Sequence, residues 1–186
     1  MKHETLIAAI EERGVALTTR VLDEMYRDPF WHARFGERAD KHGRQDGNFH
    51  IQYLAQALAS DDPNVMHNYA RWLQQVLTTR GMCTRHLAEN FDRLASAIRD
   101  AIPDSEPAVA MLHVATQALR YDDAVARRVQ DLAGATLEER ELLAYAADAI
   151  ALNMPKVFKD HVAWRKTSHT VLERLAARVP EIAGWI

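Results

Sequence analysis

Apolar residues recur at helical spacing along nearly the whole chain, and this pattern constrains the fold more than any other feature. The first such stripe runs through Leu6, Ile10, Leu17, Val21 and Met25. Similar stripes follow in the later segments, whereas no alternating apolar–polar run bounded by turn residues predicts a strand. The sequence therefore predicts an all-α protein, a helical bundle of about eight or nine helices.

Proline, glycine and capping residues predict where these helices begin and end. The polar residues 37–48 contain Gly43 and Gly47 and predict a loop. Thr136 and Glu139 match a capping box, in which each side chain accepts the other residue's free backbone amide proton. One uninterrupted stripe over residues 155–179 predicts a single long helix at the end of the chain.

An internal repeat organises the chain. The segments 53–72 and 145–164 align without a gap, and seven of their twenty positions are identical, where average residue usage gives about one or two by chance. The shared residues include a Tyr, a Pro and a Trp, so we interpret the match as a duplication rather than a coincidence between two Ala-rich amphipathic helices. Residues 1–103 and 104–186 are then two diverged helical repeats, which we expect to pack as one compact domain with a shared core.

Charge and composition exclude some classes of protein. The formal net charge is -3 and the basic residues form no stripe, so we expect no nucleic-acid binding. The longest mostly apolar run, Leu142–Leu152, is interrupted by Asp148 and is shorter than the ~20 residues of a membrane span. The single cysteine, Cys83, is predicted to be a small packing residue near a helix start. One cysteine and no secretory signal favour a cytoplasmic protein without membrane contact.

Motifs that carry known chemistries are missing from the sequence. It contains no Glu-x-x-His pair, no Cys-x-x-Cys or His-Glu-x-x-His spacing, no glycine-rich phosphate loop and no Gly-x-Ser-x-Gly. Covalent catalysis and a standard metal site therefore have no support from local patterns. Catalytic groups can also converge from distant segments, so a helical enzyme with dispersed residues stays open as an alternative.

Six aromatic and imidazole side chains are the candidate site residues, because the helical pattern places them on inner faces. The proposed ligand-binding residues are Tyr53, Trp72, Tyr145 and Trp164, and the proposed metal ligands are His50 and His161. We expect both tryptophans to be core residues and any pocket to lie between the two repeats, because clefts between packed helices are common ligand sites.

These observations favour a non-catalytic binding or regulatory module that recognises a partner protein or an apolar small molecule. The main alternative is a haem or metal protein that uses His50 or His161. A homodimer is compatible with both hypotheses. Fold class by itself does not decide between them.

Overall fold

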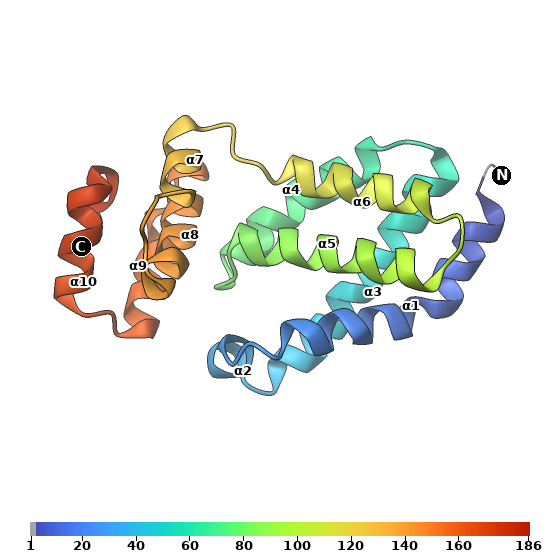
Figure 1. Ribbon diagram of the computed structural model, residues 1–186, viewed down its shortest axis with the longest axis horizontal. Coiled ribbons are helices and arrows are strands. Elements are labelled where there is room, and N and C mark those ends of the chain that lie inside the picture. Colours follow the sequence, from blue (N-terminus) through green and yellow to red (C-terminus); the bar gives the residue numbers. More distant parts are fainter. Residues whose placement is uncertain (1–2) are drawn as a thin grey trace. The chain divides into compact units, whose positions relative to one another are not determined.

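Every regular element of the computed structural model is helical within residues 3–186, the part of the chain that it describes (Figure 1). The order is α1 Glu4–Met25, α2 Phe30–Phe35, α3 Arg38–Ser60, α4 Asn64–Thr78, α5 Thr84–Ala101, α6 Glu106–Ala118, α7 Ala124–Gln130, α8 Leu137–Ala151, α9 Pro155–Arg165, α10 His169–Arg178 and the 3-10 helix η1 Pro180–Trp185. The predicted all-α class is confirmed, with ten α-helices and one 3-10 helix in the described residues. None of these helices is both long and apolar enough to cross a membrane.

The chain divides into two compact units. The first comprises the residues up to Trp72 and Ala88–Leu119, and the second comprises Leu73–Leu87 and Arg120–Ile186. Helices α4 and α5 therefore contribute residues to both units. This division differs from the repeat boundary at residues 103 and 104, and the internal duplication stays a prediction.

In the first unit, close packing between α1 and α3 overrides a predicted loop. The loop expected over residues 37–48 is wrong, because α3 is helical from Arg38 onward. Side chains at the two glycines of this segment would overlap residues of α1: Gly43 would meet Leu22, and Gly47 would meet Thr18. The two glycines therefore let two helix backbones approach each other, and their poor helix propensity, about 1 kcal/mol each, is offset by packing between the helices.

In the second unit, α8 is the central helix and packs against both α7 and α9. From Leu142 to Ala149 it is buried on all sides, as expected for a helix segment that is apolar nearly all round. Its buried residues are Glu139, Leu142, Leu143, Ala144, Tyr145, Ala146, Ala147, Asp148 and Ala149. The predicted capping box is confirmed, since Thr136 Oγ1 accepts from the Glu139 amide and Glu139 Oε2 accepts from the Thr136 amide.

The single long helix predicted over residues 155–179 is also wrong. Lys166 has a left-handed backbone with φ 53° and ends α9. Ser168 then begins α10 by accepting a hydrogen bond from the Val171 amide. The sequence did not predict this break, because the apolar residues keep their helical spacing along the sequence on both sides of the Ser168 N-cap.

The turns inside the two aligned segments share a local backbone geometry. Asp61, after α3, and Asn153, after α8, both have φ 52°. The next amide in each turn donates to the carbonyl oxygen five residues earlier, at 3.1 and 2.9 Å respectively, which is the hydrogen bond of a Schellman cap. Superposition of residues 49–78 on residues 141–170, with Trp72 on Trp164, is the measurement that tests the duplication.

Candidate functional site

His50 of α3 lies among aromatic side chains in the first unit. Its Nδ1 is 2.7 Å from Tyr69 Oη, and its ring centroid is 4.9 Å from that of Phe91. Burial lowers the pKa of His50 to about 4 and raises the pKa of Tyr69. Both groups are therefore neutral at neutral pH. The prediction that His50 is buried on an apolar face is confirmed.

Trp72 does not belong to the core of this unit. Its side chain is 57% exposed, so the prediction that it is a core residue is wrong. The buried face of α4 runs through Met66, Tyr69 and Leu73, and Trp72 is rotated from Leu73 by about 100° around the helix. Tyr53 is half-buried and stacks on Tyr69, with ring centroids 3.9 Å apart and an interplanar angle of 14°.

Phe49, Tyr53 and Trp72 together form what we call the exposed aromatic surface. Phe49 is 42% exposed and lies one helical turn before Tyr53, so their side chains are neighbours on α3. The Trp72 ring lies 6.2 Å from that of Tyr69. The stacked pair Tyr53 and Tyr69 therefore links the aromatic side chains of α3 and α4 at the surface of the first unit.

His161 of α9 is the corresponding centre of the second unit and is fully buried, as predicted. Its ring stacks on Tyr145 of α8, with centroids 3.6 Å apart and an interplanar angle of 8°. His161 Nε2 is 2.8 Å from Glu141 Oε1, and Tyr145 Oη donates to the Gly81 carbonyl oxygen at 2.8 Å. Trp164 is only partly buried, with its ring 5.5 Å from that of His161, so the prediction that it is a core residue is wrong.

Glu141 holds both a buried and an exposed partner in this cluster. Arg165 Nε donates to Glu141 Oε1 at 2.7 Å, and the Arg165 guanidinium lies 5.1 Å from the centre of the Trp164 ring. Desolvation acts to raise the pKa of Glu141, but hydrogen bonds from His161 and Arg165 outweigh it, and the pKa falls to about 2. The carboxylate is therefore charged at neutral pH and orients the imidazole of His161.

Each unit thus brings together part of the predicted site. The first unit contains one ring cluster, formed by His50, Tyr53, Tyr69 and Trp72. The second unit contains another, formed by Tyr145, His161 and Trp164. The two stacked pairs occupy corresponding positions of the aligned segments. A common pocket between the two repeats stays a prediction.

The haem or metal hypothesis gains no support from this geometry. No group of three or more His, Cys, Asp or Glu side chains within residues 3–186 could hold a metal ion. His50 already uses Nδ1 for a hydrogen bond with Tyr69, and His161 uses Nε2 for its contact with Glu141. One nitrogen of each predicted ligand is therefore committed to a protein partner.

A buried carboxylate that the sequence did not single out as a site residue lies elsewhere in the second unit. Asp148 of α8 accepts hydrogen bonds from the Thr84 amide at 2.8 Å, from Thr84 Oγ1 and from Tyr121 Oη at 2.8 Å. Gln74 Nε2 donates a hydrogen bond to Thr84 Oγ1 at 3.0 Å. The threonine hydroxyl therefore uses its own hydrogen to donate to Asp148. Because Thr84 is the first residue of α5, the carboxylate also lies at a helix N-terminus, where the helix dipole favours negative charge.

Burial nevertheless dominates the titration of Asp148 and raises its pKa to about 6. Its side chain is fully buried, and it forms no salt bridge within the described residues. The only sequence signal was an aspartate inside an Ala-rich apolar run, which does not identify a partner 64 residues away. This network explains why a carboxylate is tolerated in the central helix of the unit.

Cys83 and His86 form a local cap at the same helix start. The Cys83 amide donates to His86 Nδ1 at 3.4 Å, and the Cys83 Sγ atom is 3.5 Å from that nitrogen. Burial raises the pKa of Cys83 to about 12 and lowers the pKa of His86 to about 3. A neutral thiol in an apolar site is a poor nucleophile, so the prediction of Cys83 as a packing residue agrees with its burial. His86 is also buried.

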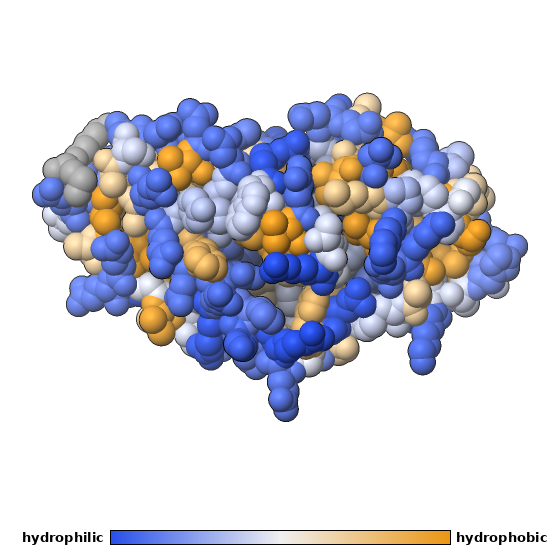
Figure 2. Space-filling view, turned by 180° about the vertical axis from the view of Figure 1, so that it is seen from behind, coloured by the Kyte–Doolittle hydropathy of each residue, from blue (hydrophilic) through white to orange (hydrophobic). Residues whose placement is uncertain are grey.

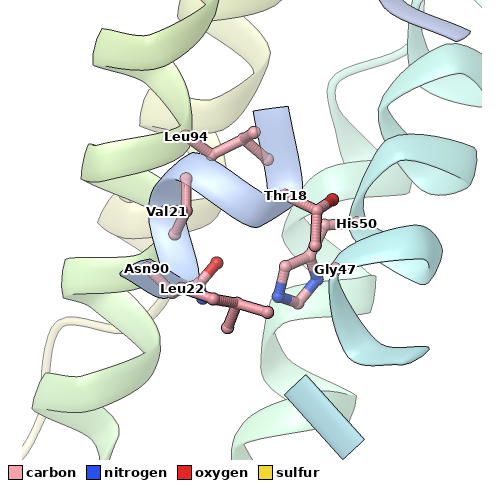
Figure 3. A pocket seen from close by; sticks show the side chains of 7 residues that line it. All are labelled: Thr18, Val21, Leu22, Gly47, His50, Asn90 and Leu94. Atoms are coloured by element: carbon pink, nitrogen blue, oxygen red, sulfur yellow. The ribbon is translucent and has the colours of Figure 1, made fainter. Parts of the chain in front are cut away.

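A small cavity lies beside His50 in the first unit, between α1, α3 and α5 (Figure 3). Its volume is about 10 Å³, and it is lined by Thr18, Val21, Leu22, Gly47, His50, Asn90 and Leu94. Pockets for apolar ligands typically have volumes of ~300–1,000 Å³. This cavity is therefore too small for such a ligand.

Compared with protein-family models, curated proteins and solved structures, the chain has no significant match.

Proposed function

We propose that this chain is a non-catalytic module that binds a partner protein through the exposed aromatic surface of its first unit. The observation that carries the proposal is Trp72, a large aromatic side chain that is 57% exposed. Tryptophan and tyrosine are enriched among the residues that dominate binding energy at protein interfaces. Tyr53 stacks on Tyr69, and this contact limits the rotation of the aromatic side chains before binding. Less side-chain entropy is therefore lost on association.

The residues around Trp72 suit a protein interface. Three exposed amide side chains of the first unit lie on the same two helices, namely Gln52 and Gln56 on α3 and Asn68 on α4. Uncharged amides donate and accept hydrogen bonds without the desolvation cost of a charge, and the centres of interfaces are depleted in charged residues. A face of this kind favours a partner that offers apolar groups surrounded by hydrogen-bonding groups.

Apolar residues are dispersed over the side of the molecule that Figure 2 shows. In Figure 2, hydrophobic residues (orange) on the side shown form separate patches divided by hydrophilic residues (blue). We therefore place the binding energy in a few aromatic groups and not in a large apolar area.

Two features of the described residues favour a protein partner over a small molecule bound beside His50 or catalysis by the buried titratable groups. The cavity beside His50 has room for only a very small ligand. Among the buried titratable groups of the second unit, Cys83 is hydrogen-bonded to His86, and Asp148 accepts hydrogen bonds from Thr84 and Tyr121. These groups have structural partners, and their arrangement offers no exposed nucleophile for catalysis.

The test compares Trp72→Ser with a matched control, Val15→Ser. Val15 is an exposed apolar residue of the same unit, with 71% of its side chain accessible. Partners are captured from a lysate of the source cells on immobilised wild-type and variant protein and then quantified by mass spectrometry. Circular dichroism and a thermal melt verify that each variant is folded.

We expect at least one protein to bind the wild type and the Val15→Ser control equally. Its affinity for Trp72→Ser should fall about 30-fold or more, because truncating a dominant interface residue costs about 2 kcal/mol or more. A purified partner then allows the dissociation constants to be measured by calorimetry. Equal capture by Trp72→Ser, or no specific capture by the wild type, would contradict the proposal.

A further inference from the structure

We infer that the cavity between α1, α3 and α5 is a specific binding site for one water molecule, held by His50, Thr18 and Asn90. This site is independent of the proposed partner surface. The argument starts from Thr18, whose side chain is 5% exposed and whose Oγ1 has no hydrogen-bond partner within residues 3–186. A buried hydroxyl without a partner is costly, and Thr18 lines this cavity.

The hydrogen bond between His50 and Tyr69 determines what His50 presents to the cavity. Tyr69 is buried, and within the described residues its hydroxyl bonds only to His50 Nδ1, at 2.7 Å. A buried phenol needs an acceptor for its proton, so Tyr69 donates and Nδ1 accepts. In a neutral imidazole the proton then belongs to Nε2, and Nε2–H donates to no residue in the described part of the chain.

Asn90 provides the complementary acceptor from α5. Its amide nitrogen is 3.4 Å from the Met25 sulfur, a weak acceptor. Its side-chain oxygen accepts no hydrogen bond from residues 3–186. Figure 3 shows Asn90 and His50 lining the same cavity from different helices.

The size and the polar groups of the cavity match one water molecule. The volume of about 10 Å³ is close to the minimum that holds a single water, and buried waters typically make about three hydrogen bonds. A water here accepts the proton of His50 Nε2, donates to the Asn90 side-chain oxygen and pairs with Thr18 Oγ1. The remaining lining residues, Val21, Leu22, Gly47 and Leu94, offer no further polar side chain.

Two independent measurements test this site on the full chain. The first is a crystal structure at about 1.5 Å resolution. We expect a well-ordered density peak within hydrogen-bonding distance, roughly 2.6–3.2 Å, of His50 Nε2, Thr18 Oγ1 and the Asn90 oxygen. A cavity without such a peak would overturn the proposal.

The second measurement is the tautomer of His50, read from long-range proton–nitrogen NMR correlations of the ¹⁵N-labelled protein at pH 7. We expect the Nε2–H form. The Tyr69→Phe variant serves as the comparison, because it removes the phenol that imposes this tautomer and leaves the ring in place. An Nδ1–H tautomer in the wild type would reverse the donor assignment and refute the water site as stated.

Discussion

Replacing Asp148 with Asn should remove a pH dependence from the stability of the protein. Burial raises the pKa of Asp148 from 3.8 to about 6 in the folded state. Because the folded state binds this proton more tightly than the unfolded state, the stabilising contribution is fully present below about pH 4. It is lost as the pH rises through about 6.

The expected magnitude follows from this shift. A shift of about two pKa units corresponds to about 3 kcal/mol, at 1.36 kcal/mol per unit. Because the unfolded carboxyl is already partly ionised at pH 4, the free energy of unfolding of the wild type should fall by about 2 kcal/mol between pH 4 and pH 7 relative to that of Asp148→Asn. Carboxylates with lowered pKa values, such as Glu141, contribute the opposite slope. Only the difference between wild type and variant isolates Asp148.

The assay is urea unfolding followed by circular dichroism at half-unit steps from pH 4 to pH 7.5. Asp160→Asn is the control, because Asp160 is an exposed residue of α9 paired with Lys156, and its pair contributes about 0–1 kcal/mol. Carboxyl ¹³C NMR of Asp148 should show a titration midpoint near 6. A pH-independent difference, or one of opposite sign, would show that the hydrogen bonds from Thr84 and Tyr121 outweigh burial and would refute this reasoning.

Four further outcomes test packing, chemistry and charge. Trp72→Ala should cost less than about 1 kcal/mol in urea unfolding, whereas Tyr145→Ala, at a fully buried side chain, should cost about 3–5 kcal/mol; similar losses would refute the difference in burial. Gly47→Ala should destabilise by about 1–3 kcal/mol through overpacking against α1, and Gly14→Ala should cost less, because its new Cβ would lie 3.3 Å from its nearest neighbour. The Cys83 thiol should react with a disulfide reagent at pH 7.5 only after denaturation, given its burial and raised pKa; rapid labelling of the native protein would contradict this. Filter binding at physiological ionic strength should detect no tight, salt-sensitive binding of DNA or RNA, because the net charge is -3.

Local rules in the sequence predicted the features that depend on neighbouring residues. Periodicity predicted the all-α class, and the capping box at Thr136 and Glu139 predicted the start of α8. The apolar faces also predicted that His50 and His161 are buried. In each case the interacting groups lie within a few turns of one helix or follow its period, so a single sequence contains the whole signal.

The apolar face of α4 shows that helical periodicity does not predict which of two adjacent residues, Trp72 or Leu73, is buried. Several apolar residues of α4 lie close to the boundary between buried and exposed faces, and the sequence favoured Trp72 over its neighbour Leu73. The structure buries Leu73 and exposes Trp72. A rotation of about 100° separates the two positions, and only the packing partners of the helix decide which of them faces inward.

Tertiary contacts alone decided the remaining features. Gly43 and Gly47 would end a helix by propensity, but α3 continues through them because α1 packs where their side chains would be. Asp148 would be excluded from an apolar helix by its charge, but Thr84, 64 residues away, supplies two of its hydrogen bonds. Both outcomes depend on which distant backbone lies alongside, and the free energy of close packing and of satisfied buried polar groups exceeds the local preferences that a sequence displays.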